Sequence, residues 1–313
     1  MAAPPTMNQR GDGLLSLFHG VIPPVVTLFT DDGKFDRQGQ GCLIDRLVDS
    51  GVHGLFFLGS AGETAHMSAE MRLEIAEFCL DKVAGRLPTL IGISWPSTRE
   101  TIRFGLHAKA HGADGVVAIN PYYAALSEAN IYRYFRDTAE AVELPLMIYN
   151  FPGVTKQDLS PDLLKRLAVD CPVIAGLKDT VDTLSHIRRS IHVIKDARPD
   201  FLVFAGYDEY LYGTMIMGGD GVVPASANFA PELTVGIYEA YRKGDHARAV
   251  ALQQRLVHIP NLYAIENPFY AVVKEAMRLT GQDISGAVLR PAAPIDPANK
   301  PVVEAALLRA GLL

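Results

Sequence analysis

The stretch CPVIAGLKDT, residues 171–180, carries the pattern that decides the fold. Residues 173–177 are all apolar or glycine, whereas a strand with one solvated face would alternate apolar and polar residues. A continuous apolar run is typical of a parallel strand that is buried on both faces. Lys178 follows this run directly, so the sequence places an amine at the carboxyl end of a buried strand.

Seven further apolar runs are separated by stretches that are typical of helices. They lie at 21–29, 53–59, 88–94, 115–121, 144–150, 201–206 and 221–226. The capping-box pattern of residues 97–100 and prolines at 161 and 231 mark helix starts between the runs. Eight strands alternating with helices predict an α/β fold, a (β/α)8 TIM barrel over residues 18–244. A doubly wound sheet is the alternative, but its glycine-rich nucleotide fingerprint is missing after the first run.

The two ends of the chain depart from this pattern. Residues 1–17 lack the apolar core of a secretory signal, and we expect a flexible N-terminal tail there. From residue 245 the strand-like runs stop and three helical stretches follow, which predicts a C-terminal helical region over residues 245–313.

Composition excludes several classes of partner. The net charge of -6 and the lack of a long basic run argue against binding to nucleic acid or to an anionic membrane surface. No apolar stretch approaches the roughly 20 residues that a membrane helix needs. The 3 cysteines are widely spaced and form no disulfide framework or zinc motif, which indicates a reducing cytoplasm.

The active site of a barrel of this kind forms at the carboxyl ends of its strands, and Lys178 ends the sixth. Desolvation lowers the pKa of a buried amine, and a neutral amine can attack a ketone to form a Schiff base. The alternative is a structural lysine that either snorkels toward water or is paired with a carboxylate such as Asp179.

Other strand ends supply complementary groups. Tyr149 ends the fifth strand and could move protons, while the Ser60 hydroxyl could hold the phenol. The backbone N–H groups of Ser60 and Ala61 could bind a carboxylate. For each residue alone, packing or an ordinary glycine-rich turn is the alternative, as it is for Tyr122 and Tyr123 after the fourth strand. The coincidence of these groups at strand ends favours an active site.

Several polar residues carry weaker signals. His107 and His111 lie four residues apart, but no third ligand stands at a useful spacing, so we expect a solvated helix face and no metal site. His66 could line the site or face water, and Glu63 could set its loop through hydrogen bonds. The loops after the last two strands lack a phosphate cradle, which favours a non-phosphorylated substrate.

A set of motifs over residues 18–295 resembles a known family when taken in order. They are GVIPPVVTLFTDDGKFD, GLFFLGSAGE, NPYY, YNFPGVT, GLKDT and GGDGVVPASANFAP. The chain resembles the dihydrodipicolinate synthase/N-acetylneuraminate lyase family of class I pyruvate-dependent aldolases, and in particular its bacterial 2-keto-3-deoxygluconate aldolases. The resemblance implies a barrel that is usually a homotetramer.

The resemblance also implies roles for individual residues. Lys178 matches the lysine that forms a Schiff base with pyruvate, so no cofactor or metal is expected. Tyr149 matches the tyrosine that relays protons, and Ser60 matches its hydroxyl partner. Ala61 stands where many members have a second hydroxyl for the pyruvate carboxylate, so only its N–H can serve here.

Further matches concern substrate specificity and assembly. Tyr123 matches a tyrosine that reaches into a neighbouring subunit's site, and Val223 matches a residue whose carbonyl faces the pyruvate. Thr155 and Thr180 could bond substrate hydroxyls or cap turns. Val154 replaces the arginine with which dihydrodipicolinate synthases hold the carboxylate of their aldehyde, a bidentate ion pair that valine cannot make. Nearby Lys156 could supply charge or face solvent.

We therefore expect a lyase that reversibly cleaves a 2-keto-3-deoxy sugar acid, such as 2-keto-3-deoxygluconate, to pyruvate and an aldehyde. Its partners would be small-molecule keto acids and aldehydes. The alternatives on the same scaffold are 4-hydroxy-tetrahydrodipicolinate synthase, N-acetylneuraminate lyase and a keto-deoxy sugar acid dehydratase. A metal-dependent aldolase and a non-catalytic keto-acid sensor are the alternatives from other classes.

Overall fold

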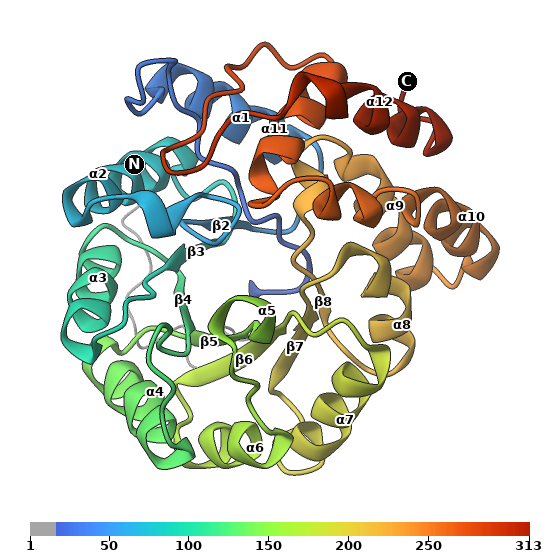
Figure 1. Ribbon diagram of the computed structural model, residues 1–313. Coiled ribbons are helices and arrows are strands. Elements are labelled where there is room, and N and C mark those ends of the chain that lie inside the picture. The colour runs from blue at the N-terminus through green and yellow to red at the C-terminus, as the bar shows by residue number, and fades with distance from the viewer. Residues whose placement is uncertain (1–16) are drawn as a thin grey trace, which may run out of the picture.

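The computed structural model describes residues 17–313, so the predicted N-terminal tail lies, apart from residue 17, outside the described residues. The predicted (β/α)8 barrel is confirmed: eight parallel strands form one sheet in the order β1-β8-β7-β6-β5-β4-β3-β2 (Figure 1). The strands are β1 (Gly20–Val21), β2 (Leu55–Phe57), β3 (Thr89–Gly92), β4 (Gly115–Ile119), β5 (Leu146–Asn150), β6 (Ile174–Asp179), β7 (Leu202–Ala205) and β8 (Gly221–Val222).

The sheet closes between β1 and β2. Pro24 forms a parallel bridge with Phe56, and the Val25 N–H donates to the Phe56 carbonyl at 2.8 Å. The doubly wound alternative is therefore wrong. The first strand is much shorter than the apolar run 21–29, because Pro23 and Pro24 have no N–H to donate to a ladder.

Helices surround the strands as an outer ring (Figure 1). They are α1 (Arg37–Asp49), α2 (Ala69–Val83), α3 (Thr98–Ala110), α4 (Glu128–Val142), α6 (Pro161–Asp170), α7 (Leu184–Lys195), α8 (Leu211–Ile216) and α9 (Pro231–Arg242). At the predicted starts of α3 and α6, the Ser97 and Ser160 side chains accept hydrogen bonds from the N–H groups of Glu100 and Leu163. The short helix α5 (Pro152–Thr155) lies over the middle of the ring in this view.

Successive side chains of each strand point alternately into the barrel and outward to the helices, so the strands separate two apolar layers. The interior of the barrel is filled by Phe18, Ile22, Phe56, Leu90, Val117, Ile119, Met147, Tyr149, Leu202, Phe204 and Val223. Ile148 and Leu177 belong to the other layer, which packs against the helices. Tyr149 and Lys178 pair in register on β5 and β6, so both side chains point into the barrel.

The C-terminal residues form three further helices at one side of the barrel, α10 (His246–Leu256), α11 (Tyr270–Leu279) and α12 (Lys300–Arg309) (Figure 1). Within the described residues, no strand follows β8. Among residues 17–313, no helix has both the length and the apolar character needed to cross a membrane. The single turn at 260–264 returns to the mouth of the barrel and lines the cavity there.

Candidate active site

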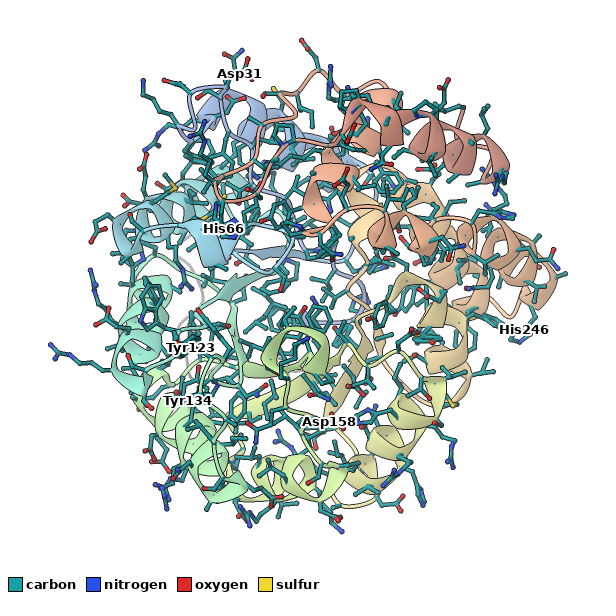
Figure 2. The ribbon with its side chains drawn as sticks, viewed as in Figure 1. Asp31, His66, Tyr123, Tyr134, Asp158 and His246 are labelled. Atoms are coloured by element: carbon teal, nitrogen blue, oxygen red, sulfur yellow. The ribbon has the colours of Figure 1, made fainter. Side chains whose placement is uncertain are left out.

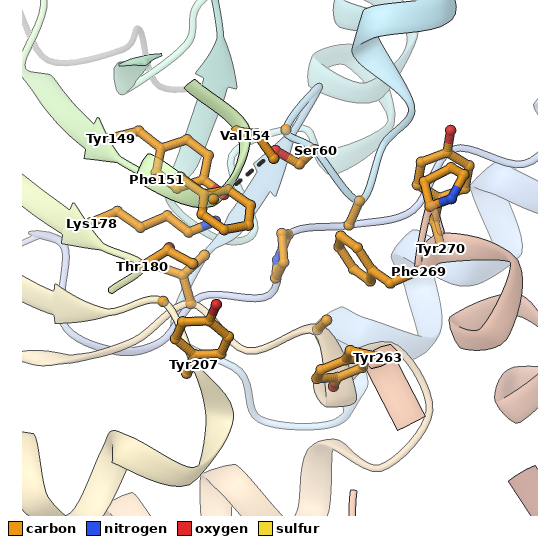
Figure 3. Close-up of a pocket in the computed structure, with 18 of the residues that line it drawn as sticks. Ser60, Tyr149, Phe151, Val154, Lys178, Thr180, Tyr207, Tyr263, Phe269 and Tyr270 are labelled. Atoms are coloured by element: carbon orange, nitrogen blue, oxygen red, sulfur yellow. Dashed lines mark hydrogen bonds between the residues drawn. The ribbon is translucent and has the colours of Figure 1, made fainter. Parts of the chain in front are cut away.

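A cavity of about 810 Å³ opens at the carboxyl ends of the strands, where the sequence predicts the active site (Figure 3). Its volume suits a small-molecule substrate rather than a macromolecule. Of the predicted site residues, the structure brings six to this cavity. They are Ser60, Ala61, Tyr149, Lys178, Thr180 and Val223.

Lys178 is buried at the inner end of the cavity, with only 4% of its surface exposed. Its Nζ lies 4.0 Å from the centre of the Tyr149 ring and 5.1 Å from that of Phe56. Burial lowers the pKa of this amine to about 7, although the negative charge of Asp208 opposes the shift. Near neutral pH a large fraction of the amine is therefore uncharged and nucleophilic.

Lys178 does not pair with its neighbour Asp179. The Asp179 side chain points away from the barrel interior and accepts a hydrogen bond from His186 Nδ1 at 2.7 Å and one from Asn150 at 3.1 Å. Hydrogen bonds to Asp158 and then to Asp179 raise the pKa of His186 to about 10, so this histidine is a cation at neutral pH. Asp179 is thus neutralised on the outer side of the sheet, and the alternative of a Lys178–Asp179 pair is wrong.

Tyr149 stands beside the lysine and contacts Ser60. The two hydroxyl oxygens lie 3.4 Å apart (Figure 3). Burial raises the pKa of the Tyr149 phenol to about 12, and the hydrogen bond between this phenol and the Ser60 hydroxyl opposes this rise. At neutral pH the phenol is therefore protonated. It can act first as a proton donor, and it can act as a base only after it has lost that proton.

The loop after β2 presents free backbone N–H groups to the cavity. The N–H groups of Gly62 and Glu63 close a turn by donating to the carbonyls of Gly59 and Ser60, at 3.1 Å in each case. Those of Ser60 and Ala61 have no acceptor among residues 17–313. Two neighbouring unpaired donors of this kind are suited to a carboxylate.

Backbone strain marks the same loop. Leu58 and Glu63 have φ angles of 58° and 61°, in the left-handed region that non-glycine residues rarely adopt. A Cβ atom at Gly92 would lie 2.0 Å from the Leu58 carbonyl oxygen, so glycine is needed there for the loop to take this path. Such strain persists where the surrounding structure fixes the backbone.

A buried ion pair holds the loop from behind. Lys274 on α11 and Glu63 are both fully buried, and the ammonium donates to Glu63 Oε1 and to the Ala287 carbonyl. The other Glu63 oxygen accepts the Leu289 N–H at 2.7 Å. Glu63 therefore sets its loop through hydrogen bonds, as expected, and ties that loop to the C-terminal helical region.

The remaining predicted residues lie in different positions. Thr180 lines the cavity. Its hydroxyl forms no hydrogen bond of ordinary geometry among the described residues, but it lies close enough to the Tyr149 phenol to lower the pKa of that group. The structure does not bring Thr155 to the cavity; its hydroxyl bonds the carbonyls of Phe151 and Gln157, as the turn-capping alternative expects. Tyr123 is fully exposed, beside α3 and α4 (Figure 2), and the cavity is lined by Tyr122 instead.

The structure also shows the positions of His66 and Lys156, for each of which the sequence left two roles open. His66 lines the cavity, and its Nδ1 lies 2.9 Å from the Tyr270 hydroxyl, so it bridges the β2 loop to α11. Lys156 is exposed, and its Nζ donates to the Gly153 carbonyl at 2.8 Å outside the cavity. Val154, at the position of the family's arginine, lines the cavity.

The structure adds residues that the sequence reasoning missed. After β7, Tyr207, Asp208 and Glu209 line the cavity, and Tyr263 from the C-terminal region donates to Asp208. Figure 3 shows Tyr207 and Tyr263 at this side of the cavity. Burial raises the pKa of Asp208 to about 7. The sequence GYDEY, residues 206–210, directly follows β7, and this position could have identified the two carboxylates as site residues. Nothing in the pattern around Tyr263 indicates that its side chain reaches the mouth of the barrel.

Acidic side chains outnumber basic ones in the cavity wall. Within the described part of the chain, the wall holds four carboxylates and no arginine, and Lys178 is its only lysine. The carboxylates are Glu63, Asp182, Asp208 and Glu209. Glu63 is neutralised by Lys274, and Asp182 accepts a hydrogen bond from the Tyr210 hydroxyl at 2.7 Å. The wall therefore offers carboxylate acceptors to hydroxyl donors, and it has no arginine with which to pair a second anionic group.

The barrel and this set of strand-end groups define a pyruvate-dependent lyase of the aldolase type. The chain belongs to the dihydrodipicolinate synthetase family, which it matches over residues 17–310.

Two relatives and two solved structures illustrate the similarity. The chain is 50% identical over 285 residues to the Escherichia coli K12 protein named "Putative 2-dehydro-3-deoxy-D-gluconate aldolase YagE", covering 91% of this chain and 94% of that protein. It is 44% identical over 296 residues to "Probable 2-dehydro-3-deoxy-D-pentonate aldolase YjhH" of the same strain, covering 95% and 98%. The crystal structure of YagE in complex with pyruvate matches with a TM-score of 0.93 and 48% identity, over 95% of this chain and 100% of that chain. Dihydrodipicolinate synthase from Aquifex aeolicus matches with a TM-score of 0.88 and 27% identity, over 94% and 99%.

Proposed function

We propose that the chain is a Schiff-base aldolase that reversibly cleaves a 2-keto-3-deoxy sugar acid, such as 2-keto-3-deoxygluconate, to pyruvate and an aldehyde. The observation that carries the proposal is the buried amine of Lys178, about half of which is neutral at pH 7, beside the protonated phenol of Tyr149. The names of the two Escherichia coli relatives support the same substrate class.

The two pKa values order the proton transfers. The neutral Lys178 amine adds to the C2 ketone and gives a carbinolamine. Tyr149 donates its proton to the departing hydroxyl, which leaves as water, so that an iminium cation and a phenolate remain side by side. The phenolate then removes the C4 hydroxyl proton, the C3–C4 bond breaks, and its electrons reduce the iminium to a neutral enamine. Protonation at C3 and hydrolysis release pyruvate and restore both groups.

The substrate carboxylate would sit on the free N–H groups of Ser60 and Ala61. This placement leaves the keto carbon next to the strand ends that carry Lys178 and Tyr149. No cofactor is needed in this scheme, because the iminium itself accepts the electrons of the breaking bond.

The cavity wall favours a polyhydroxylated aldehyde portion. Hydroxyl groups of a sugar acid can donate to Asp208 and Glu209, and the Thr180 hydroxyl can bond another. An aldehyde with its own carboxylate, such as aspartate semialdehyde, would meet these acidic groups and Val154 instead of an arginine. This contrast favours the sugar acid over the 4-hydroxy-tetrahydrodipicolinate synthase reaction.

We also propose that the active enzyme is an oligomer, most simply a homotetramer. Tyr123 is a fully exposed aromatic residue with a φ of 78°, and a neighbouring subunit's cavity would give this side chain a partner. Sedimentation of the wild type as a monomer at all concentrations at which it is active would exclude this assembly.

Borohydride trapping tests the covalent step. With pyruvate and sodium borohydride, we expect an irreversible adduct whose mass maps to the peptide that contains Lys178, with loss of activity. Lys178→Met should form no adduct, while Lys156→Met should react like the wild type because its amine lies outside the cavity. Failure of the wild type to form the adduct would exclude Schiff-base catalysis and leave the sensor or the metal-dependent alternative.

A substrate panel tests specificity separately. Pyruvate release is measured from 2-keto-3-deoxygluconate, 2-keto-3-deoxygalactonate, a 2-keto-3-deoxypentonate and N-acetylneuraminate, and pyruvate consumption is measured with aspartate semialdehyde. We expect turnover with the keto-deoxy sugar acids. Rapid turnover only with aspartate semialdehyde would overturn the argument from the cavity wall, and loss of water without release of an aldehyde would indicate a dehydratase.

A further inference from the structure

Three side chains that can bind metal ions meet on the outer surface of the barrel, away from the cavity. His107 lies in the last turn of α3, His111 follows at its C-cap, and Glu77 comes from the neighbouring helix α2. None of the three lines the cavity. The sequence shows only the pair of histidines, because Glu77 lies 30 residues earlier and is brought to them by the packing of α2 on α3.

The geometry of this cluster is close to that of a bound metal. One ligand atom from each side chain can be chosen so that all three lie within 4.8 Å of one another. Ligands about 2.1 Å from a tetrahedral ion lie about 3.4 Å apart, so modest side-chain rotations would complete the site. The two imidazole rings already face each other, with centroids 4.3 Å apart and planes 31° apart.

The potential ligand atoms are not committed to other interactions. Among residues 17–313, neither the carboxylate of Glu77 nor the ring nitrogens of His107 and His111 take part in a hydrogen bond or an ion pair. The Nδ1 atom of His107 is buried without a partner, which is costly unless a ligand or a proton donor satisfies it. A metal ion bound through this nitrogen would provide that partner.

We propose that Glu77, His107 and His111 bind one Zn²⁺ ion per chain and thereby clip α2 to α3. Two imidazoles and one carboxylate form a donor set that zinc accepts, with water in the fourth position on the exposed side. Calcium and magnesium prefer sites built from oxygen ligands alone. The ion would lie outside the reaction pathway, and its role is to stabilise the outer helices.

Zinc titration of the untagged full-length chain, freed of metal by chelator, tests the proposal. Calorimetry or competition with a chromophoric chelator should show one Zn²⁺ per chain and a rise in melting temperature on zinc addition. The variants Glu77→Gln, His107→Ala and His111→Ala should each weaken binding by about tenfold or more and reduce the thermal shift. Circular dichroism of each metal-free variant confirms that it remains folded.

His192→Ala is the matched control. His192 lies on a helix, exposed to solvent, and faces a carboxylate four residues away, Asp196, but it has no second imidazole beside it. This variant should bind zinc like the wild type. Absence of saturable zinc binding, or wild-type affinity in His111→Ala, would overturn the proposal. Borohydride trapping on Lys178 should be the same with and without zinc, so this test succeeds or fails independently of the proposed aldolase activity.

Discussion

Replacement of Lys178 by methionine should make the stability of the protein respond differently to pH. In the folded chain, burial lowers the pKa of Lys178 from 10.5 to about 7. Between these two values the unfolded chain binds a proton that the folded chain does not bind. The linkage relation then requires the free energy of unfolding to rise with pH across this window, and to level off above the pKa of the unfolded chain.

The magnitude follows from the pKa difference. A difference of about 3.5 in pKa corresponds to about 5 kcal/mol over the whole window, at 1.36 kcal/mol for each unit. Between pH 7 and pH 9 this single group should contribute about 2 kcal/mol, because half of the folded molecules are still protonated at pH 7. Lys178→Met has no such group, so the stability of the wild type relative to this variant should increase by that amount.

Urea unfolding of both proteins at pH 7 and pH 9, at one fixed protein concentration, measures this change. Lys156→Met is the control, because its exposed amine should leave the pH dependence of the wild type unaltered. A constant difference between the wild type and Lys178→Met at the two pH values would mean that the amine is solvated or permanently charged, and the proposed nucleophile would be lost with it.

Three further variants test other parts of the site. Tyr149→Phe should lower kcat by about 10²-fold to 10⁴-fold while pyruvate still forms a slow borohydride adduct, and wild-type kcat would exclude the proton relay. Lys274→Met leaves the buried Glu63 carboxylate unpaired and should cost about 3–5 kcal/mol in urea unfolding, most of which Glu63→Gln in the same chain should restore. Asp208→Asn removes a charge that raises the pKa of Lys178, so the acid limb of the kcat/KM profile should move to lower pH; a shift to higher pH would contradict this electrostatic assignment.

Local patterns were sufficient to predict the barrel and the inner part of its site. Continuous apolar runs identify buried parallel strands, and the carboxyl end of such a strand fixes the height at which Lys178 and Tyr149 emerge. Strand lengths could not be predicted equally well. The run 21–29 is apolar throughout, but its two prolines interrupt the ladder, and only Gly20–Val21 is a strand.

Contacts between segments that are far apart in the sequence could not be predicted from the spacing of residues. Tyr263 reaches Asp208, and Lys274 reaches Glu63, across 55 and 211 residues of sequence. Nothing in the local pattern of the C-terminal helices distinguishes these side chains from ordinary core residues. Thr155, at the end of α5, uses its hydroxyl within its own turn, and the sequence alone could not distinguish this from a bond to a substrate.

Exclusion of water from the barrel mouth acts in opposite directions on the two central groups. In water a lysine with a pKa of 10.5 and a tyrosine with a pKa of 10.0 would lose their protons almost together. Burial disfavours the ammonium and the phenolate alike, so the pKa of Lys178 falls to about 7 and that of Tyr149 rises to about 12. Over the interval between them both groups are neutral, and the amine is ready to attack while the phenol still holds the proton that the leaving hydroxyl needs. In the proposed reaction the phenolate would form only when the iminium cation appears beside it, so the covalent step would itself produce the base that the next step requires.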